Sequence, residues 1–477
     1  MIWSISWKNI WRNKIRSSIV IVAVSLGIFG GVFSTAVMIG AIDQRIREAI
    51  GNEVSHVQIH NKQYLDNNEL KYSINNSRSI IDSIKTLENV KAVSGRVKTF
   101  AMANTSGSAS GVMINAVDPE TEKSVSTIYK QIKNGGDYLD ADNKKPIVIG
   151  ERLAKELRLV TYEIDNEVIN TLKEDPRFDE TIPGLESLLN KKYRKVEDFE
   201  NDLIEVLGEE TYKEYEYPIK GTSIKYKLRK KIVLSFQTNA GNISYDAYRV
   251  CGVYKTNNSA FDALNVFVRK ADILRVLGLN ESDVHEIAVL VDENGQEDEV
   301  AKNIQSMIHE EDLSVQTWSE LLPDVGLYND YMDVMLMLVL SILLLAMGFG
   351  IVNTMLMAVL ERVKELGMLM AIGMNRKKVF SMIMLETILL CMVGAVVGMI
   401  VSYGLIIYSG KYGIDLTAGY QAGLEVWGFS AMLYPKIGWD SFLQVTILVI
   451  ITGILASIYP ARKALKLNPS EALRVDM

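Results

Sequence analysis

The stretch ERVKELGMLMAIGMNRKKVF, residues 361–380, decides the architecture because a membrane-length apolar run lies on each side of it. Seven of its twenty residues are charged. VMLMLVLSILLLAMGFGIVNTMLMAVL (334–360) comes before it, and SMIMLETILLCMVGAVVGMIVSYGLIIYS (381–409) follows. A bilayer core of about 30 Å needs roughly 20 apolar residues in a helix. The sequence therefore predicts transmembrane helices at 334–360 and 379–409, joined by a short charged segment at 361–378.

Two more segments are long enough to span a membrane, residues 17–42 and 441–459. Basic residues precede the first of them, as they do in a secretory signal peptide. Its uncharged run of 26 residues is longer than the apolar region of a signal peptide, which has roughly 7–15 residues. We therefore expect 17–42 to be a retained membrane anchor and the first of four transmembrane helices.

The distribution of Lys and Arg predicts the orientation of these helices. Basic residues cluster in segments 1–16, 361–378 and 460–477, whereas the loop 410–440 has only Lys411 and Lys436. Loops rich in Lys and Arg stay in the cytoplasm. All three basic segments are cytoplasmic if the chain has four spans with both termini inside. Residues 43–333 and 410–440 are then extracytoplasmic.

The large segment 43–333 is acidic. It has 36 basic and 50 acidic residues, a net charge of −14, whereas the whole chain has a net charge of −7. Such a segment repels nucleic acid, so we exclude nucleic acid as a partner. Two cysteines, Cys251 and Cys391, provide no disulfide framework.

Segment 43–333 has the pattern of a mixed α+β domain. Short apolar runs that predict strands alternate with segments of helical periodicity. A stretch at about 160–230 is richer in Tyr, Lys and Glu, and we interpret it as a helical insertion. Predicted strands include AVSGRVKTFAMAN, SGVMINAVD, KPIVIG, KIVLSF, AYRVCGVYK, NVFVR and EIAVLVD.

The first sixteen residues predict an amphipathic helix at the membrane interface. Trp3, Trp7 and Trp11 share one helical face, and Lys8 and Arg12 lie on another. Aromatic rings beside cationic side chains are typical of helices at the level of the lipid headgroups.

The predicted spans contain small and polar residues that suggest helix contacts. Gly27, Gly31, Gly394 and Gly398 form two G-x-x-x-G pairs, which allow close helix packing in lipid. Glu386 lies in the third span, where a carboxylate must face protein or water. A hydrogen bond between helices is the favoured explanation, with Asn353 of the second span as a candidate partner, although a proton or substrate role stays open.

Three polar residues alternate along EVSHVQIHN (53–61): His56, Gln58 and His60. The period of two predicts a strand with Val57 and Ile59 inside and the three polar residues on a solvated face. A helical metal site is disfavoured, and we expect no metal on this chain. The sequence has no G-x-x-x-x-G-K-[ST] phosphate loop and no catalytic signature, so we expect a non-catalytic chain.

Segment 361–378 predicts a short helix with Val363, Leu366 and Met370 along one face. Gly373 can end this helix, and Asn375 can cap the start of the next one. From the residues alone, a hairpin that only turns the chain is at least as probable as a docking site.

ERVKELGMLMAIGMNRKKVFSMIMLET resembles the signature of FtsX-like permease domains of MacB/LolC/LolE-type ABC transporters. The tail SIYPARKALKLNPSEALR (457–474) and the opening SWKNIWRNKIRSSI are similar to the same families. The resemblance implies a MacB-type periplasmic core domain and a coupling helix that contacts a separate cytoplasmic ATPase, which binds ATP and Mg. The implied coupling residues are Glu361, Arg362, Glu365, Leu366, Gly367, Met368, Ala371 and Gly373.

The order of segments most resembles the lipoprotein-releasing LolC/LolE permeases of the bacterial inner membrane. This resemblance implies a homo- or heterodimer, membrane lipids as surroundings, and a lipoprotein and periplasmic carrier as further partners. Two features depart from the family pattern: the link 237–247 is short where the carrier-binding member has a long hairpin, and the 160–230 insertion is additional. MacB-like efflux and FtsX-like signalling to a cell-wall hydrolase are the alternatives.

Overall fold

A computed structural model describes residues 7, 12, 14–139, 144–292, 295–308 and 310–465. Trp3, Lys8, Trp11 and the tail from residue 466 therefore lie outside the described residues. The chain divides into two compact units: 1–43, 328–414 and 433–477 form the first, and 44–327 with 415–432 form the second.

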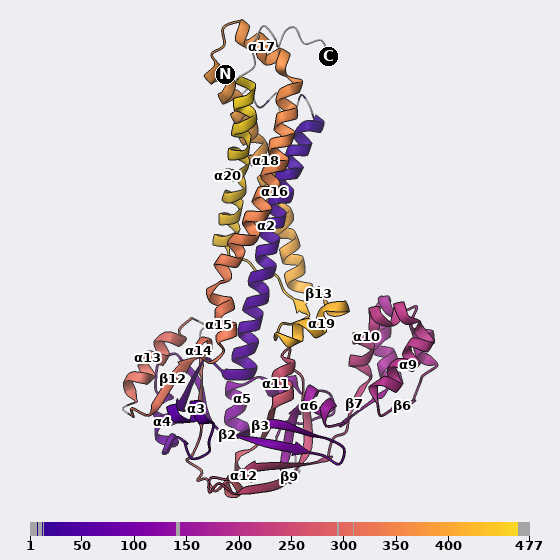
Figure 1. Cartoon of the computed structure of the whole chain (residues 1–477), viewed down its shortest axis with the longest axis vertical. Coiled ribbons are helices and arrows are strands. Elements are labelled where there is room, and N and C mark those ends of the chain that lie inside the picture. Colours follow the sequence, from indigo (N-terminus) through magenta and orange to yellow (C-terminus); the bar gives the residue numbers. More distant parts are fainter. Residues whose placement is uncertain are drawn as a thin grey trace. The chain divides into compact units, whose positions relative to one another are not determined.

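The first unit is a bundle of long helices (Figure 1). Helix α20 packs against both α16 and α18, and α2 packs against α18. These helices extend past the predicted spans, because polar residues at their ends continue the helical turns. The long helices and the short α17 of this unit are α2 (Lys14–Glu48), α16 (Met332–Glu361), α17 (Val363–Ala371), α18 (Arg376–Tyr412) and α20 (Trp439–Leu465), and α15 (Pro323–Asp330) precedes α16 with its first five residues in the second unit.

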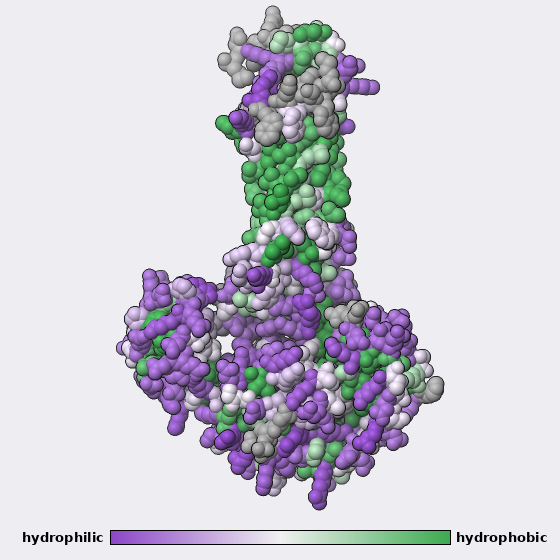
Figure 2. Space-filling model, turned by 180° about the vertical axis from the view of Figure 1, so that it is seen from behind, coloured by the Kyte–Doolittle hydropathy of each residue, from purple (hydrophilic) through white to green (hydrophobic). Residues whose placement is uncertain are grey.

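Four helices are long and apolar enough to cross a membrane by length and composition: Ser17–Val54, Met332–Glu361, Arg376–Tyr412 and Trp439–Lys463. Figure 2 shows hydrophobic side chains gathered along the helices of this unit on the face drawn. Because apolar side chains cover the outside of these helices, the bundle is suited to a lipid environment rather than to water.

The second unit is an α/β domain with a nine-stranded sheet in the order β12-β1-β11-β2-β3-β10-β4-β9-β8. All of its strands except β12 lie in segments from which strands were predicted. The strands of this sheet are β1 (Val57–Asn61), β2 (Val90–Asn104), β3 (Ala109–Val117), β4 (Pro146–Gly150), β8 (Lys231–Gln237), β9 (Ile243–Tyr254), β10 (Asn265–Arg269), β11 (Glu286–Val291) and β12 (Leu313–Thr317).

The long strand β2 organises this sheet. Its first half pairs with β11, in the register Val93↔Val289. Its second half pairs with β3 on one edge and with β8 on the other. Strands β2, β3, β10, β4, β9 and β8 therefore close into a ring, and β11, β1 and β12 continue from the first half of β2 as an open sheet.

Short helices cover these strands. Apolar residues of α4 and α13 pack with β1, β2, β11 and β12 in one core, and α12 packs into the core that the ring encloses. The helical elements are η1 (Ala49–Val54), α3 (Lys62–Asn67), α4 (Ser77–Ile84), α5 (Pro119–Val125), η2 (Ile128–Gln131), α6 (Glu151–Glu156), α11 (Ser259–Leu264), α12 (Lys270–Leu277), α13 (Glu297–Met307) and α14 (Trp318–Leu321).

Residues 160–226 form a subdomain between α6 and β8. Strand β5 pairs with both β6 and β7, and Val160 lies opposite Tyr226, so the two ends of the segment are adjacent. Phe199 and Leu203 are fully buried in it. Its elements are β5 (Val160–Glu163), α7 (Asn166–Lys173), η3 (Pro176–Phe178), α8 (Ile182–Glu186), β6 (Lys192–Tyr193), α9 (Val196–Leu207), α10 (Glu209–Ser223) and β7 (Ile224–Tyr226).

The segment between α18 and α20 also has structure. Strands β13 (Ile414–Asp415) and β14 (Met432–Leu433) pair with each other, and α19 (Thr417–Val426) lies between them. Within the second unit, α19 packs against α10 and α11, and Lys255 Nζ lies 3.2 Å from Glu425 Oε1.

The prediction of a solvated face on β1 is wrong. His56, Gln58 and His60 are 4%, 3% and 4% exposed. The His60 ring stacks on Tyr64 of α3, and its Nε2 lies 2.8 Å from Gln58 Oε1. Strand β1 is buried on both faces, and the polar side chains of its second face contact other protein groups instead of solvent. Alternation of polar and apolar residues cannot distinguish these two cases.

Candidate functional site

Helix α17 is a separate short helix between α16 and α18. Arg362, with φ −104° and ψ 15°, breaks the helical path after α16. Gly373 has φ +97°, a conformation that residues with a Cβ rarely adopt, and it follows the end of α17. The Asn375 side chain accepts a hydrogen bond from Lys377 N at 3.1 Å and caps α18. The predictions that Gly373 ends this helix and that Asn375 caps the next one are confirmed.

One side of α17 packs into the helix bundle. Leu366 is 2% exposed and belongs to the apolar cluster formed by α2, α16, α18 and α20. Gly367 beside it is also buried. Burial of a leucine side chain contributes about 2 kcal/mol. The helix therefore has a fixed inner side.

A chain of ion pairs holds the start of α17. Arg362 Nε donates to Glu365 Oε2 at 2.9 Å, and Arg362 Nη1 donates to Glu386 Oε2 of α18 at 3.0 Å. Glu365 also pairs with Arg12. These contacts connect three segments that are far apart in the sequence: the N-terminal segment, α17 and α18.

Glu386 is buried, with 4% of its surface exposed. The sequence suggested Asn353 as its partner, and this suggestion is wrong: Asn353 is exposed, and Arg362 provides the ion pair. The reason is geometric, because the break at Arg362 turns its guanidinium toward α18.

The carboxyl group of Glu365 has a lowered pKa. Partial burial raises this pKa, but hydrogen bonds from Arg362 and Arg12 outweigh the effect of burial. Glu365 therefore stays ionised at neutral pH. Because its side chain is 42% exposed, the solvent screens these pairs, and each contributes at most about 1 kcal/mol.

The other side of α17 is open and has helical spacing. Lys364, Met368, Ala371 and Ile372 are exposed, at positions i, i+4, i+7 and i+8. Met368 is 51% exposed and Ile372 is 80% exposed. We call these four residues the α17 outer face. It combines two large apolar side chains with one cation.

The remaining predicted coupling residues divide between the two sides. Glu361 and Gly373 are exposed, and Arg362 and Glu365 are partly buried in the ion pairs. Of the predicted interfacial residues, Trp7 and Arg12 are exposed. The face predicted from Val363, Leu366 and Met370 is the inner one, since Leu366 is buried and the other two are half-buried. The sequence gave no signal for the pairing of Arg12 with Glu365.

The four glycines predicted to pack helices lie at close contacts. A Cβ added to Gly394 would lie 2.9 Å from Val24 Cβ, and one added to Gly398 would lie 3.0 Å from Ser25 O, both on α2. Gly27 faces Met347 of α16, and Gly31 faces Val445 of α20. Ser25 Oγ donates to Gly394 O at 2.9 Å. Small residues here let the helix backbones approach closely.

Comparison with known families identifies this region. Residues 337–469 match the FtsX-like permease C-terminal family. This match includes α17 and all of the long helices except α2. This part of the chain is therefore similar to the C-terminal domain of FtsX-like permeases.

Relatives are ABC transporter permeases. An uncharacterized ABC transporter permease of Methanocaldococcus jannaschii is 29% identical over 231 residues, 48% of this chain and 55% of that protein. The macrolide export ATP-binding/permease protein MacB of Agrobacterium fabrum is 27% identical over 234 residues, 48% of this chain and 34% of that protein. The uncharacterized ABC transporter permease YknZ of Bacillus subtilis is 26% identical over 167 residues, 35% of this chain and 38% of that protein.

The chain thus matches between about a third and about half of the length of these relatives.

Two solved structures are also similar. The extracellular domain of a YknZ transporter has a TM-score of 0.29 and 13% identity, and it covers 55% of this chain and 99% of that domain. The periplasmic region of MacB from Actinobacillus actinomycetemcomitans has a TM-score of 0.30 and 12% identity, and it covers 60% of this chain and 97% of that region.

Proposed function

We propose that this chain is the permease subunit of an ABC transporter that transmits ATP-driven motion across a bacterial inner membrane. In this proposal a cytoplasmic ATPase, which binds ATP and Mg, contacts the α17 outer face. Both chain termini are cytoplasmic, and the α/β unit is on the other side of the membrane. The chain itself catalyses no reaction.

The observation that carries this proposal is the two-sided environment of α17. Its inner side is fixed by Leu366 and by the ion pairs of Arg362, whereas Met368 and Ile372 are exposed outside. A helix that only turns the chain would require neither a fixed inner side nor exposed apolar side chains on its outer side. A force applied to the outer face would pass into α18 through Arg362 and Glu386, because a buried charged pair resists displacement. The homologous ABC permeases support an ATPase as the partner.

The test of docking is native mass spectrometry of the complex purified gently from the organism's own membranes. We expect two permease subunits with two ATPase subunits. Met368→Glu puts a charge on the outer face and should remove the ATPase, since loss of a central interface residue costs about 2 kcal/mol or more, roughly a 30-fold weaker complex. Met368→Leu keeps the apolar surface and should retain the ATPase. Retention of the ATPase by Met368→Glu would contradict docking at this face.

For the cargo we propose a lipoprotein that the complex releases from the inner membrane, with a periplasmic carrier as acceptor. The order of segments around FtsX-like motifs supports this proposal. Efflux is the second candidate, because several relatives are named macrolide export proteins. An acylated protein that copurifies with the complex supports lipoprotein release. A periplasmic adaptor without an acylated protein supports efflux, and a cell-wall hydrolase supports signalling.

A further inference from the structure

The first long helix joins the sheet through an unusual segment. Helix α2 ends at Glu48 and continues as η1, a π-helix over Ala49–Val54, and β1 begins at Val57. Ser55 between them has φ 69° and ψ −174°, a region that is almost restricted to glycine. π-Helical turns are rare and occur often at functional positions. The covalent link from helix to sheet thus contains one strained residue, which is buried and held by hydrogen bonds from Ser55 N to Ile50 O at 2.9 Å and from Ser55 Oγ to Val289 O at 3.0 Å.

A second link connects η1 to the sheet without passing through Ser55. Thr127 N donates to Gly51 O at 2.7 Å, and Thr127 Oγ1 donates to Asn52 Oδ1 at 2.7 Å. A Cβ added to Gly51 would lie 3.1 Å from Thr127 Oγ1, so a larger residue would crowd this contact. Thr127 lies two residues after the end of α5.

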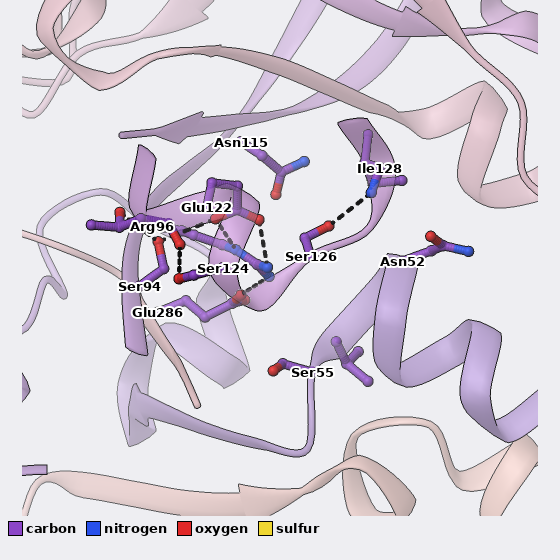
Figure 3. Close-up of polar contacts among 12 residues, drawn as sticks. Asn52, Ser55, Ser94, Arg96, Asn115, Glu122, Ser124, Ser126, Ile128 and Glu286 are labelled. Carbon is purple, nitrogen blue, oxygen red and sulfur yellow. Dashed lines mark hydrogen bonds and ion pairs between the residues drawn. The ribbon is translucent and has the colours of Figure 1, made fainter. Parts of the chain in front are cut away.

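Helix α5 is itself held to the sheet by buried charges. Arg96 of β2 donates to Glu122 of α5 through Nε at 3.0 Å and through Nη2 at 2.7 Å. Its Nη1 donates to Glu286 of β11 at 2.6 Å. Figure 3 shows the Arg96 side chain between the two carboxylates. Glu122 and Glu286 are 0% exposed, and Arg96 is 4% exposed. Bidentate ion pairs of this kind have a fixed geometry.

Other contacts hold the same segment from a different direction. Asn257 Nδ2 donates to Glu48 Oε1 at 2.7 Å, and Asn258 Nδ2 donates to Glu53 Oε1 at 3.1 Å. Arg45 Nη1 also donates to Glu53 Oε1 at 2.8 Å. The end of α2 is therefore held by two separate parts of the α/β unit in addition to its own chain.

We propose that Thr127, positioned by the Arg96–Glu122 ion pair, is the coupling residue that makes the end of α2 move as one body with the sheet. This inference rests on the proposed function, since it names the joint through which helix motion would reach the extracytoplasmic unit. The helix end is attached through Ser55 and through the contacts of Glu48 and Glu53 with Asn257 and Asn258. Thr127 adds two contacts with the sheet side, its backbone N–H at Gly51 and its hydroxyl at Asn52, and two separated contacts fix an orientation that one contact leaves free.

The test measures whether the joint is rigid. Spin labels are placed on introduced cysteines at Arg47 of α2 and Lys231 of β8, both exposed positions in the second unit. The native cysteines, Cys251 and Cys391, are buried, and burial raises the pKa of the Cys251 thiol to about 12, so they are poor labelling sites. Pulsed electron paramagnetic resonance then gives the distribution of label distances in the full-length chain in lipid nanodiscs.

We expect one narrow distance distribution in the parent chain and a broader one in Thr127→Val, which replaces the hydroxyl by a methyl group and leaves only the backbone contact with Gly51. Asn52→Ala removes the acceptor of the same hydrogen bond and should have the same effect. Thr127→Ser keeps the hydroxyl and should restore the narrow distance. The melting temperature of each variant shows whether the unit still folds.

A distance distribution as narrow as that of the parent chain in both Thr127→Val and Asn52→Ala would overturn the proposal. Equal broadening in Thr127→Ser would also overturn it, because side-chain volume rather than the hydroxyl would then be responsible. The measurement needs no ATPase. A negative result would overturn only the inference about Thr127 and η1, whereas absence of an ATPase from the purified complex would contradict the proposed function.

Discussion

The ion pair between Arg362 and Glu386 provides the sharpest test of how α17 is attached to the bundle. The Glu386 side chain is 5% exposed and that of Arg362 is 15% exposed. Arg362→Met removes the cation that faces a buried carboxylate. Removal of one partner from a buried pair lowers the free energy of unfolding by about 3–5 kcal/mol. Because Arg362 is partly exposed, we expect a decrease of about 3 kcal/mol.

Glu386→Gln should cost less, because Arg362 keeps its second partner Glu365 at 2.9 Å. The free energy of unfolding of Glu386→Gln then falls by the contribution of one charged hydrogen bond, about 1.5 kcal/mol. In the double variant Arg362→Met with Glu386→Leu, neither charge of the buried pair is left behind. We therefore expect it to be less destabilised than the sum of the single changes.

The assay is thermal unfolding of the full-length chain in nanodiscs, followed by intrinsic fluorescence. Arg376→Met is the matched control, since Arg376 is exposed at the start of α18. We expect the order of melting temperatures to be control, Glu386→Gln, Arg362→Met, from highest to lowest. Equal losses in the two single variants, strict additivity in the double variant, or the same loss in the control would refute the reasoning.

Three further predictions concern other parts of the chain. Gly394→Ala places a Cβ 2.9 Å from Val24 Cβ and should cost about 1–3 kcal/mol in the same unfolding assay, whereas Gly350→Ala, with nothing within 4 Å, should cost nothing. Burial lowers the pKa of His60 to about 4 from an unfolded value of 6.5, although Glu286 opposes this shift. The unfolded state then binds more protons between these two values, so stability is present above pH 6.5 and is lost as the pH falls toward 4, by about 3 kcal/mol in total. His60→Gln should flatten this part of the stability–pH curve, and an unchanged slope would contradict it. Glu365→Arg replaces the carboxylate between Arg362 and Arg12 by a third cation. It should leave the chain inserted and ATP hydrolysis measurable but abolish transport by the reconstituted complex, and normal transport with normal ATPase binding would count against α17 as the coupling helix.

The α/β unit shows where a local pattern is sufficient and where it is not. Strands β2, β3, β4, β8, β9, β10 and β11 lie in the apolar runs that predicted them, because a run of β-branched and apolar residues between turn residues is a local signal. The ring closed by the pairing of β8 with β2 was not predicted. It depends on contacts between residues more than 100 positions apart, such as Ala101 and Phe236.

The α17 region shows the same division. Its length, its charge and the roles of Gly373 and Asn375 follow from the sequence alone, because helix ends are set by a few neighbouring residues. The sorting of Met368 and Ile372 to an open side, and of Leu366 to the inside, required knowledge of where α18 and α20 lie. So did the choice of Arg362 over Asn353 as the partner of Glu386.

The sequence by itself determined the number of membrane-length helices, the separation of a basic helical part from an acidic α/β part, and the short charged helix between two spans. These properties are sums over neighbouring residues, so the order of residues is enough to compute them. Only the tertiary structure showed that the polar face of β1 is buried, that Arg96 joins β2 to α5 and β11, and that Thr127 contacts η1, the continuation of α2. A polar side chain has the same identity in water and in a buried ion pair, and its environment is set by whichever distant segments fold over it.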